Sequence, residues 1–286
     1  MHPILNIATL AAKEAGEFIA QQLNNIDRLT IEHKGKNDYV SEVDQHAERI
    51  IIDIIRKYYP NHSILAEESG TQNKASDFEW IIDPLDGTTN FLHQFPQFSV
   101  SIAVTEKGKL MHGVVYDPLR DELFCASKGQ GARLNNYRIR VSEQKTLTDA
   151  LMATGIPYYN FEYVDAYLES FKAFMLQTAG IRRPGSAALD LAYVACGRVD
   201  GYWELNLQPW DIAAGALIVQ EAGGMVTDFI GGHDYLNTGN VIAANPKMLK
   251  AMAGVIGRTI PLTFREKRPD TTTKAQQAQK APNQSS

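Results

Sequence analysis

One short segment, residues 83–91, constrains this chain more than any other. It reads Asp-Pro-Leu-Asp-Gly-Thr-Thr-Asn-Phe and follows the apolar run 80–82, which predicts a buried strand that ends at the first aspartate. The proline and the glycine break the strand, so two carboxylates three residues apart can converge on one point. A hard divalent cation such as Mg²⁺ binds oxygen ligands in this kind of arrangement. The threonine pair that follows supplies hydroxyls close enough to polarise a water on such a cation.

Composition limits the function classes that the chain can belong to. Its 286 residues are 44% hydrophobic, which is typical of a globular protein with a sizeable core. The formal net charge of −5 gives no bulk attraction to nucleic acid or anionic membranes, so binding of an anionic phosphate needs local positive charge or a metal. Two distant cysteines, no signal peptide and no apolar membrane span predict a cytoplasmic protein without a disulfide framework or zinc site.

The first half of the chain, residues 1–150, has an α+β pattern. Apolar residues at helical spacing predict two amphipathic helices, at 3–23 and from Ser41 to Pro60. Alternating apolar residues and turn signals predict strands at 63–66, 78–82, 98–104, 110–116, 122–126 and 132–140.

The second half, residues 151–262, alternates helices with strands in an α/β pattern. Helices are predicted at 161–176, 186–196, 211–222 and after Pro246, and strands at 201–204, 224–227 and 241–244. Residues 263–286 lack an apolar stripe, so a disordered tail is expected there.

Acidic residues recur where predicted strands end and helices begin. Glu67 and Asp83 follow two strands, Asp86 comes three residues later, Asp211 begins a helix of the second half, and Asp44 lies in the first turn of another helix. If the two halves pack together, these acids could meet in the cleft between them. Carboxylates gathered in one place repel one another strongly unless cations neutralise them, so such a cluster implies metal.

Each element of this pattern also has an ordinary structural explanation. Asp44 could complete a capping box with Ser41, and Asp211 could cap its own helix. Glu67 could lie in a solvated loop, and the Asp-Pro-Leu-Asp-Gly segment could be a plain turn. The small residues 185–188 could expose backbone N–H groups that hold an anion, or could simply form an N-cap.

These residues carry a family resemblance. The segments Trp-Ile-Ile-Asp-Pro-Leu-Asp-Gly-Thr-Thr-Asn-Phe at 80–91, Trp-Asp-Ile-Ala-Ala-Gly at 210–215 and Glu-Glu-Ser at 67–69 resemble the signatures of the inositol monophosphatase family. This family lies within the metal-dependent, lithium-sensitive phosphatases. The resemblance covers residues 1–262, and the segments 182–195 and 198–204 are most similar to the bacterial branch.

The resemblance implies a fold and a set of metal ligands. The fold would be a layered α-β-α-β-α sandwich of α/β class, usually a homodimer, with two or three Mg²⁺ ions in each site. Glu67, Asp83 and the carbonyl of Leu85 would hold the first Mg²⁺, and Asp83, Asp86 and Asp211 the second.

It also implies catalytic and substrate contacts. Glu67 and Thr88, the latter hydrogen-bonded toward Asp44, would orient the attacking water. The amides of Gly87 and Thr88 would contact phosphate. The polyol contacts would be Gly185, Ser186, Ala187, Glu204 and Asp211.

The predicted chemistry is hydrolysis of myo-inositol 1-phosphate or a similar small polyol phosphate by in-line attack of water. Two Mg²⁺ ions could neutralise the phosphate, lower the pKa of the water and stabilise the leaving alkoxide. Adenosine 3′,5′-bisphosphate, histidinol phosphate and fructose 1,6-bisphosphate remain alternative substrates. A largely non-catalytic role as a partner of a transcription or RNA-maturation complex also remains open.

Overall fold

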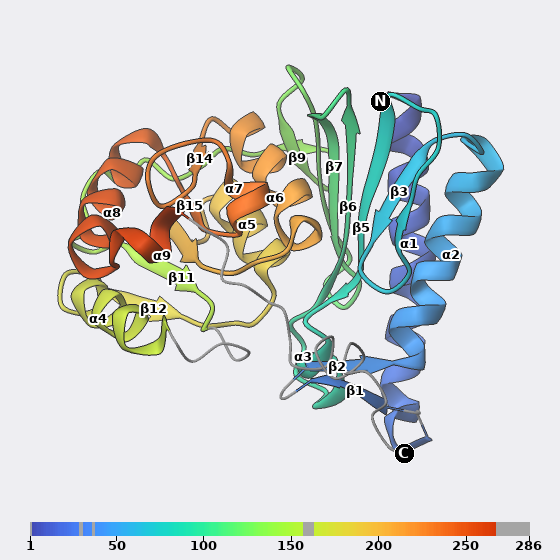
Figure 1. Ribbon diagram of the computed structural model, residues 1–286, viewed down its shortest axis with the longest axis horizontal. Helices are drawn as coiled ribbons and strands as arrows, with labels where there is room; N and C mark the ends of the chain where they lie inside the picture. Colours follow the sequence, from blue (N-terminus) through green and yellow to red (C-terminus); the bar gives the residue numbers. More distant parts are fainter. Residues whose placement is uncertain (1, 29–30, 36–37, 157–162, 267–286) are drawn as a thin grey trace, which may run out of the picture.

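Helices and sheets alternate in five layers across the molecule (Figure 1). The structure, a computed structural model, describes residues 2–28, 31–35, 38–156 and 163–266. The first layer consists of α1 (Pro3–Gln22) and α2 (Glu42–Tyr58), which confirm the two helices predicted in the first half. In α2 the side chains of Val43, Ala47 and Ile51 form a buried stripe at helical spacing, which is why this helix packs on a sheet.

The second layer is an eight-stranded sheet in the order β10-β9-β8-β7-β6-β5-β3-β4. β3 and β5 run parallel, and the other neighbouring pairs are antiparallel. The single strand predicted at 132–140 is wrong, because Asn135 and Asn136 adopt positive φ and turn the chain between two short strands. The strands are β3 (Ser63–Ala66), β4 (Gly70–Gln72), β5 (Phe78–Asp86), β6 (Ser99–Glu106), β7 (Lys109–Asp117), β8 (Glu122–Ser127), β9 (Ala132–Leu134) and β10 (Tyr137–Arg138).

β5 continues four residues beyond its predicted end at Ile82. The prediction that this strand ends at the first aspartate is wrong, because pairing with β6 continues to Asp86 across a register shift. Pro84 lies within that irregular stretch, where a strand tolerates a residue that cannot donate a backbone hydrogen bond. Both aspartates therefore belong to the strand and not to a turn that follows it.

The third layer is helical and lies between the two large sheets. It contains α5 (Ala187–Ala195) and α6 (Pro209–Glu221). In α6 every residue from 212 to 219 is buried, because the helix is covered on both sides.

The fourth layer is a five-stranded sheet in the order β12-β11-β13-β15-β14. Its strands all follow residue 150 in the sequence. They are β11 (Leu151–Thr154), β12 (Gly180–Arg182), β13 (Gly201–Glu204), β14 (Met225–Thr227) and β15 (Val241–Ala244).

The fifth layer comprises α4 (Val164–Met175) and α8 (Pro246–Thr259). Residues 161–162 of the helix predicted at 161–176 lie outside the described residues. The predicted start of the disordered tail is wrong, because α9 (Leu262–Glu266) continues to residue 266; the remainder, 267–286, lies outside the described residues. The described part also contains η1 (Leu23–Arg28), β1 (Ile31–Gly35), β2 (Asp38–Ser41), α3 (Thr88–Leu92) and α7 (Tyr235–Thr238).

Three apolar cores join these layers. One lies between α1, α2 and the eight-stranded sheet, one surrounds α5 and α6 between the two sheets, and one lies between the five-stranded sheet and the helices α4 and α8. The mixed α/β sandwich expected from the sequence is thereby confirmed. Within the described ranges, no helix combines the length and apolar character needed to cross a lipid bilayer.

Candidate functional site

The register of two parallel strands places Glu67 beside Asp83. Ala66 of β3 pairs with Ile82 of β5, and the amide of Glu67 donates to the Ile82 carbonyl over 3.1 Å. Side chains alternate across a strand, so Asp83 lies on the same face as Ile81, whose core includes α6. A hydrogen bond joins the side chains of Glu67 and Asp83.

The irregular end of β5 brings Asp86 back toward the same place. The Leu85 amide donates to Asp83 Oδ1 over 3.0 Å, which folds the backbone around the first carboxylate. Gly87 then adopts a φ of 99°, a conformation that favours glycine, and a Cβ there would lie 3.0 Å from the Gln97 carbonyl oxygen. This turn begins α3, and Thr88 is its first residue.

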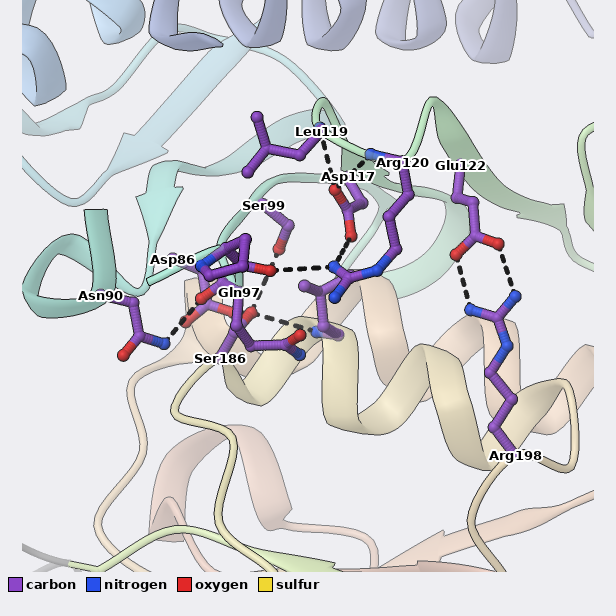
Figure 2. Close-up of polar contacts among 12 residues, drawn as sticks. Asp86, Asn90, Gln97, Ser99, Asp117, Leu119, Arg120, Glu122, Ser186 and Arg198 are labelled. Carbon is purple, nitrogen blue, oxygen red and sulfur yellow. Dashed lines mark hydrogen bonds and ion pairs between the residues drawn. The ribbon is translucent and has the colours of Figure 1, made fainter. Parts of the chain in front are cut away.

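Asp86 binds the amino-terminal end of α5, although the two lie a hundred residues apart in sequence (Figure 2). Its Oδ2 accepts from Ser186 Oγ over 2.5 Å and from the Ala188 amide over 2.8 Å. Ser186 also caps the helix by accepting from the Leu189 amide. Both alternatives for residues 185–188 therefore hold, because the segment is an N-cap and the anion that it holds is a carboxylate of the protein itself.

Asp211 likewise has two roles. Its Oδ2 accepts from the Gln208 amide over 2.7 Å, which completes the start of α6 as the capping explanation required. The same side chain lies close enough to Asp83 for its charge to raise the pKa of that carboxyl group. The structure therefore gathers Glu67, Asp83, Asp86 and Asp211 from β3, β5 and α6.

Burial and mutual repulsion raise the pKa values of these acids. The pKa of Asp83 lies well above its usual range because of burial first and the charges of Glu67, Asp86 and Asp211 second. Burial raises the pKa of Asp211 to about 8, with a further contribution from the charge of Asp86. Asp86 reaches a pKa of about 6, because burial raises it while the bonds from Ser186 and the α5 amides lower it.

The chemistry of this donor set fits a hard divalent cation. All four side chains offer carboxylate oxygens, which Mg²⁺ prefers, and a cation would reverse the repulsion that raises their pKa values. In the described ranges, no three His, Cys, Asp or Glu side chains are already spaced as a metal cage.

Beside this cluster, the partly exposed Thr88 is paired with the buried Asp44. Thr88 Oγ1 donates to Asp44 Oδ1 over 2.8 Å and lies 3.1 Å from the Leu85 carbonyl oxygen. Asp44 is 1% exposed, so its charge acts through a dry environment. Asp44 thus contacts a residue 44 positions away, and a purely local capping role does not account for its side chain.

Glu204, the last residue of β13, lies close to Asp211 and the acidic cluster. Burial raises its pKa to about 7, against a hydrogen bond from Tyr202 and the charge of Arg183, which both lower it. Tyr202 donates to Glu204 Oε2 over 2.5 Å. Gly155 makes room for this carboxylate, since a Cβ there would lie 1.9 Å from Glu204 Oε1.

Two residues of this region were missed in the sequence. Asp190 on α5 is buried, its Oδ1 lacks a hydrogen-bond partner among the described residues, and its pKa is raised well above the usual range by burial and by the charges of Glu204 and Asp86. In the sequence, Asp190 is signalled by being the one acid within an apolar helical pattern. Asn90 donates to the carbonyl oxygens of Gln97 at 2.6 Å and Pro184 at 2.9 Å, which ties α3 to the loop before α5.

Comparison with known proteins identifies the family of the chain. The sequence profile of the inositol monophosphatase family matches residues 1–258. The Escherichia coli (strain K12) protein named Nus factor SuhB is 53% identical over 253 residues, covering 88% of this chain and 95% of that protein.

Solved structures show the same fold. A suhB extragenic suppressor protein from Bartonella henselae has a TM-score of 0.88 and 44% identity, with coverage of 91% of this chain and 100% of that one. An inositol monophosphatase from Anabaena (Nostoc) sp. PCC 7120 has a TM-score of 0.81 and 41% identity, with coverage of 91% and 97%. The chain belongs to the inositol monophosphatase family.

Proposed function

We propose that this chain is a Mg²⁺-dependent phosphomonoesterase that hydrolyses myo-inositol 1-phosphate or a similar small polyol phosphate. One observation carries the proposal: Glu67, Asp83, Asp86 and Asp211 meet next to the Thr88–Asp44 pair. Family membership supports the reaction class, and a related structure is titled as Staphylococcus aureus SaIMPase-II with inositol monophosphate bound.

The family resemblance assigns the residues that would hold the metal, and their proximity supports the assignment. Glu67, Asp83 and the carbonyl of Leu85 would hold one Mg²⁺, and Asp83, Asp86 and Asp211 a second. When bound, the ions neutralise the phosphate and lower the pKa of the attacking water. Ser186 fixes Oδ2 of Asp86 and the Gln208 amide fixes Oδ2 of Asp211, so the other oxygen of each carboxylate would remain available to a cation.

The remaining residues would orient water and substrate. Thr88 gives its proton to Asp44, so the lone pairs of its oxygen can accept a hydrogen bond from the attacking water and turn the water's own lone pair toward phosphorus. Glu67 would accept the second proton of that water. The amides of Gly87 and Thr88 would contact the phosphate.

The polyol would lie against the second half of the molecule. Glu204, at a pKa near 7, can accept hydrogen bonds from hydroxyl groups without a full charge. Gly185 and Ala187, at the start of α5, would present backbone groups to the same hydroxyls.

The test is phosphate release from four esters, with and without Mg²⁺ and with Li⁺ as inhibitor. We expect Mg²⁺-dependent turnover of myo-inositol 1-phosphate to exceed turnover of adenosine 3′,5′-bisphosphate, histidinol phosphate and fructose 1,6-bisphosphate. Asp211→Asn keeps the bond to Gln208 and should lower kcat by at least about 100-fold. Asp228→Asn is the matched control, because Asp228 is a buried carboxylate that accepts hydrogen bonds from backbone amides of its own loop. Full turnover by the Asp211 variant would exclude the assigned site.

The name Nus factor SuhB supports a second function. Proteins of that name are about half identical to this chain, and the name places them with a transcription complex. The chain would then act as a partner in such a complex, either as the expected homodimer or as a single copy. Cells that lack the gene should regain growth with the inactive Asp211→Asn protein if the partner role dominates, and fail to regain it if catalysis does. Light scattering after gel filtration tests the homodimer.

A further inference from the structure

Glu48, on α2, is a buried carboxylate that the proposed chemistry leaves without a role. It is 3% exposed, although it belongs to a residue type that is almost never buried without partners. Both of its oxygens accept backbone hydrogen bonds. Oε2 accepts from the Glu68 amide over 2.8 Å, and Oε1 accepts from the Ser69 amide over 2.9 Å.

These two amides belong to the turn that carries Glu67. β3 ends at Ala66 and β4 begins at Gly70, so the three residues between them lack the regular pairing of a strand interior. The Glu67 amide is held by the Ile82 carbonyl, and the next two amides are held by Glu48. The Glu67 backbone is thus fixed on one side by the sheet and on the other by a charged group from a helix.

The same helix also fixes the other loop of the site. Asp44 precedes Glu48 by four residues, so the two side chains leave α2 on one face, one turn apart. Asp44 holds Thr88, and Glu48 holds the turn after Glu67. α2 therefore sets the distance between the two segments that would supply the water-orienting groups.

We propose that Glu48 is a positioning residue of the metal site, which holds the turn at 67–69 so that the Glu67 carboxylate faces Asp83. The inference rests on the proposed function, since it assigns Glu67 a role toward Mg²⁺. Charge-assisted hydrogen bonds from a carboxylate to backbone amides are short and strong, as these two are. Removing such an outer support of a metal ligand typically weakens metal affinity about 10- to 100-fold.

Glu48→Gln is the test variant, because its amide oxygen can still accept one of the two hydrogen bonds. Glu221→Gln is a matched control. Each carboxylate oxygen of Glu221 also accepts a hydrogen bond from a backbone amide, that of Gly129 over 2.8 Å and that of Gly131 over 2.7 Å. Glu221 lies at the opposite end of α6 from Asp211.

Mg²⁺ affinity is measured by calorimetry and by the Mg²⁺ dependence of phosphate release. We expect Glu48→Gln to raise the Mg²⁺ dissociation constant about 10- to 100-fold while kcat at saturating Mg²⁺ stays within a few-fold of wild type. Glu221→Gln should bind Mg²⁺ as wild type does. Wild-type Mg²⁺ affinity in the Glu48 variant would overturn the inference, and so would equal losses in both variants.

Two further outcomes keep the inference separate from its premise. Wild-type protein that neither binds Mg²⁺ nor releases phosphate would refute the proposed function itself. If Glu48→Gln does not fold, Glu48→Asp replaces it, since Asp keeps the charge but draws the carboxylate back by one methylene. Its Mg²⁺ affinity should also fall, and an unchanged affinity would refute the positioning role.

Discussion

The contact between β7 and α6 gives the sharpest prediction, because it is made by backbone atoms. Gly113 on β7 faces Ala214 on α6. A Cβ added at Gly113 would lie 2.9 Å from the Ala214 carbonyl oxygen and 3.1 Å from its Cα, where ordinary contact begins at 3.4 Å. Backbone atoms cannot rotate away, so Gly113→Ala must push α6 off the sheet by a few tenths of an ångström.

The size of the effect follows from packing. Overpacking of a dense core costs about 1–3 kcal/mol, and loss of glycine freedom in the unfolded chain returns about 0.4–1 kcal/mol. Gly113→Ala should therefore lower the free energy of unfolding by about 1–2 kcal/mol. The shift also moves Asp211, which α6 carries, away from Asp83, so Mg²⁺ affinity should fall as well.

Denaturant unfolding in EDTA measures the first effect, and calorimetric Mg²⁺ titration measures the second. Gly254→Ala on α8 is the control, because its nearest neighbour atom would be 3.6 Å away and alanine favours a helix by up to about 1 kcal/mol. The control should gain stability and keep its Mg²⁺ affinity. A Gly113 variant with unchanged unfolding and Mg²⁺ affinity would refute the claim that this packing positions Asp211.

Three other changes have defined outcomes. Gly155→Ala should displace the Glu204 carboxylate and raise KM for myo-inositol 1-phosphate about 10-fold, by loss of about one hydrogen bond, while turnover of a substrate with fewer hydroxyls stays unchanged. Asp83→Asn should raise the melting temperature in EDTA, because it removes a buried charge, and should abolish the rise that Mg²⁺ gives to wild type. Burial and the charge of His2 lower the pKa of His112 to about 4, so the unfolded chain binds its proton first and stability is lost as pH falls from 6.5 to about 4. His112→Gln should recover up to about 2 kcal/mol of that loss at pH 4 after allowance for solvent screening, and an identical pH profile in both proteins would contradict this.

Local sequence pattern was sufficient for most helices and strands. α2 and α8 have apolar stripes that only a helix can bury on one face, and both lie where predicted. The end of β5 could not be predicted in the same way. Pro84 signals a break, and only the pairing of Asp86 with Ser99 on β6 shows that the strand continues beyond it.

The residues proposed for the site came from short motifs and the family resemblance, which also predicted the bond from Thr88 to Asp44. The contacts of Asp86 and Asp211 were not predicted in this way. Asp86 binds Ser186 across a hundred residues, and no local rule connects the two. At Asp211 the capping explanation does not exclude a place in the acidic cluster, since the side chain accepts from the Gln208 amide and also lies close to Asp83. The sequence alone could have indicated Glu48, because it lies one helical turn from Asp44 on the same predicted helix.

The four acids are held by separate elements of the fold, β3, β5 and α6, and this explains how the fold tolerates their repulsion. Glu67 and Asp83 are fixed by the register of two parallel strands, whereas Asp211 is fixed by a helix that two sheets bury completely. The amino-terminal end of α5 anchors Asp86. Just beyond the carboxyl-terminal end of α5, Arg198 pairs with Glu122 on β8 of the eight-stranded sheet (Figure 2). No single loop can relax to separate the charges, because each displacement would open an apolar interface. The packing of β3, β5 and α6 thus maintains the repulsion that a bound cation would relieve.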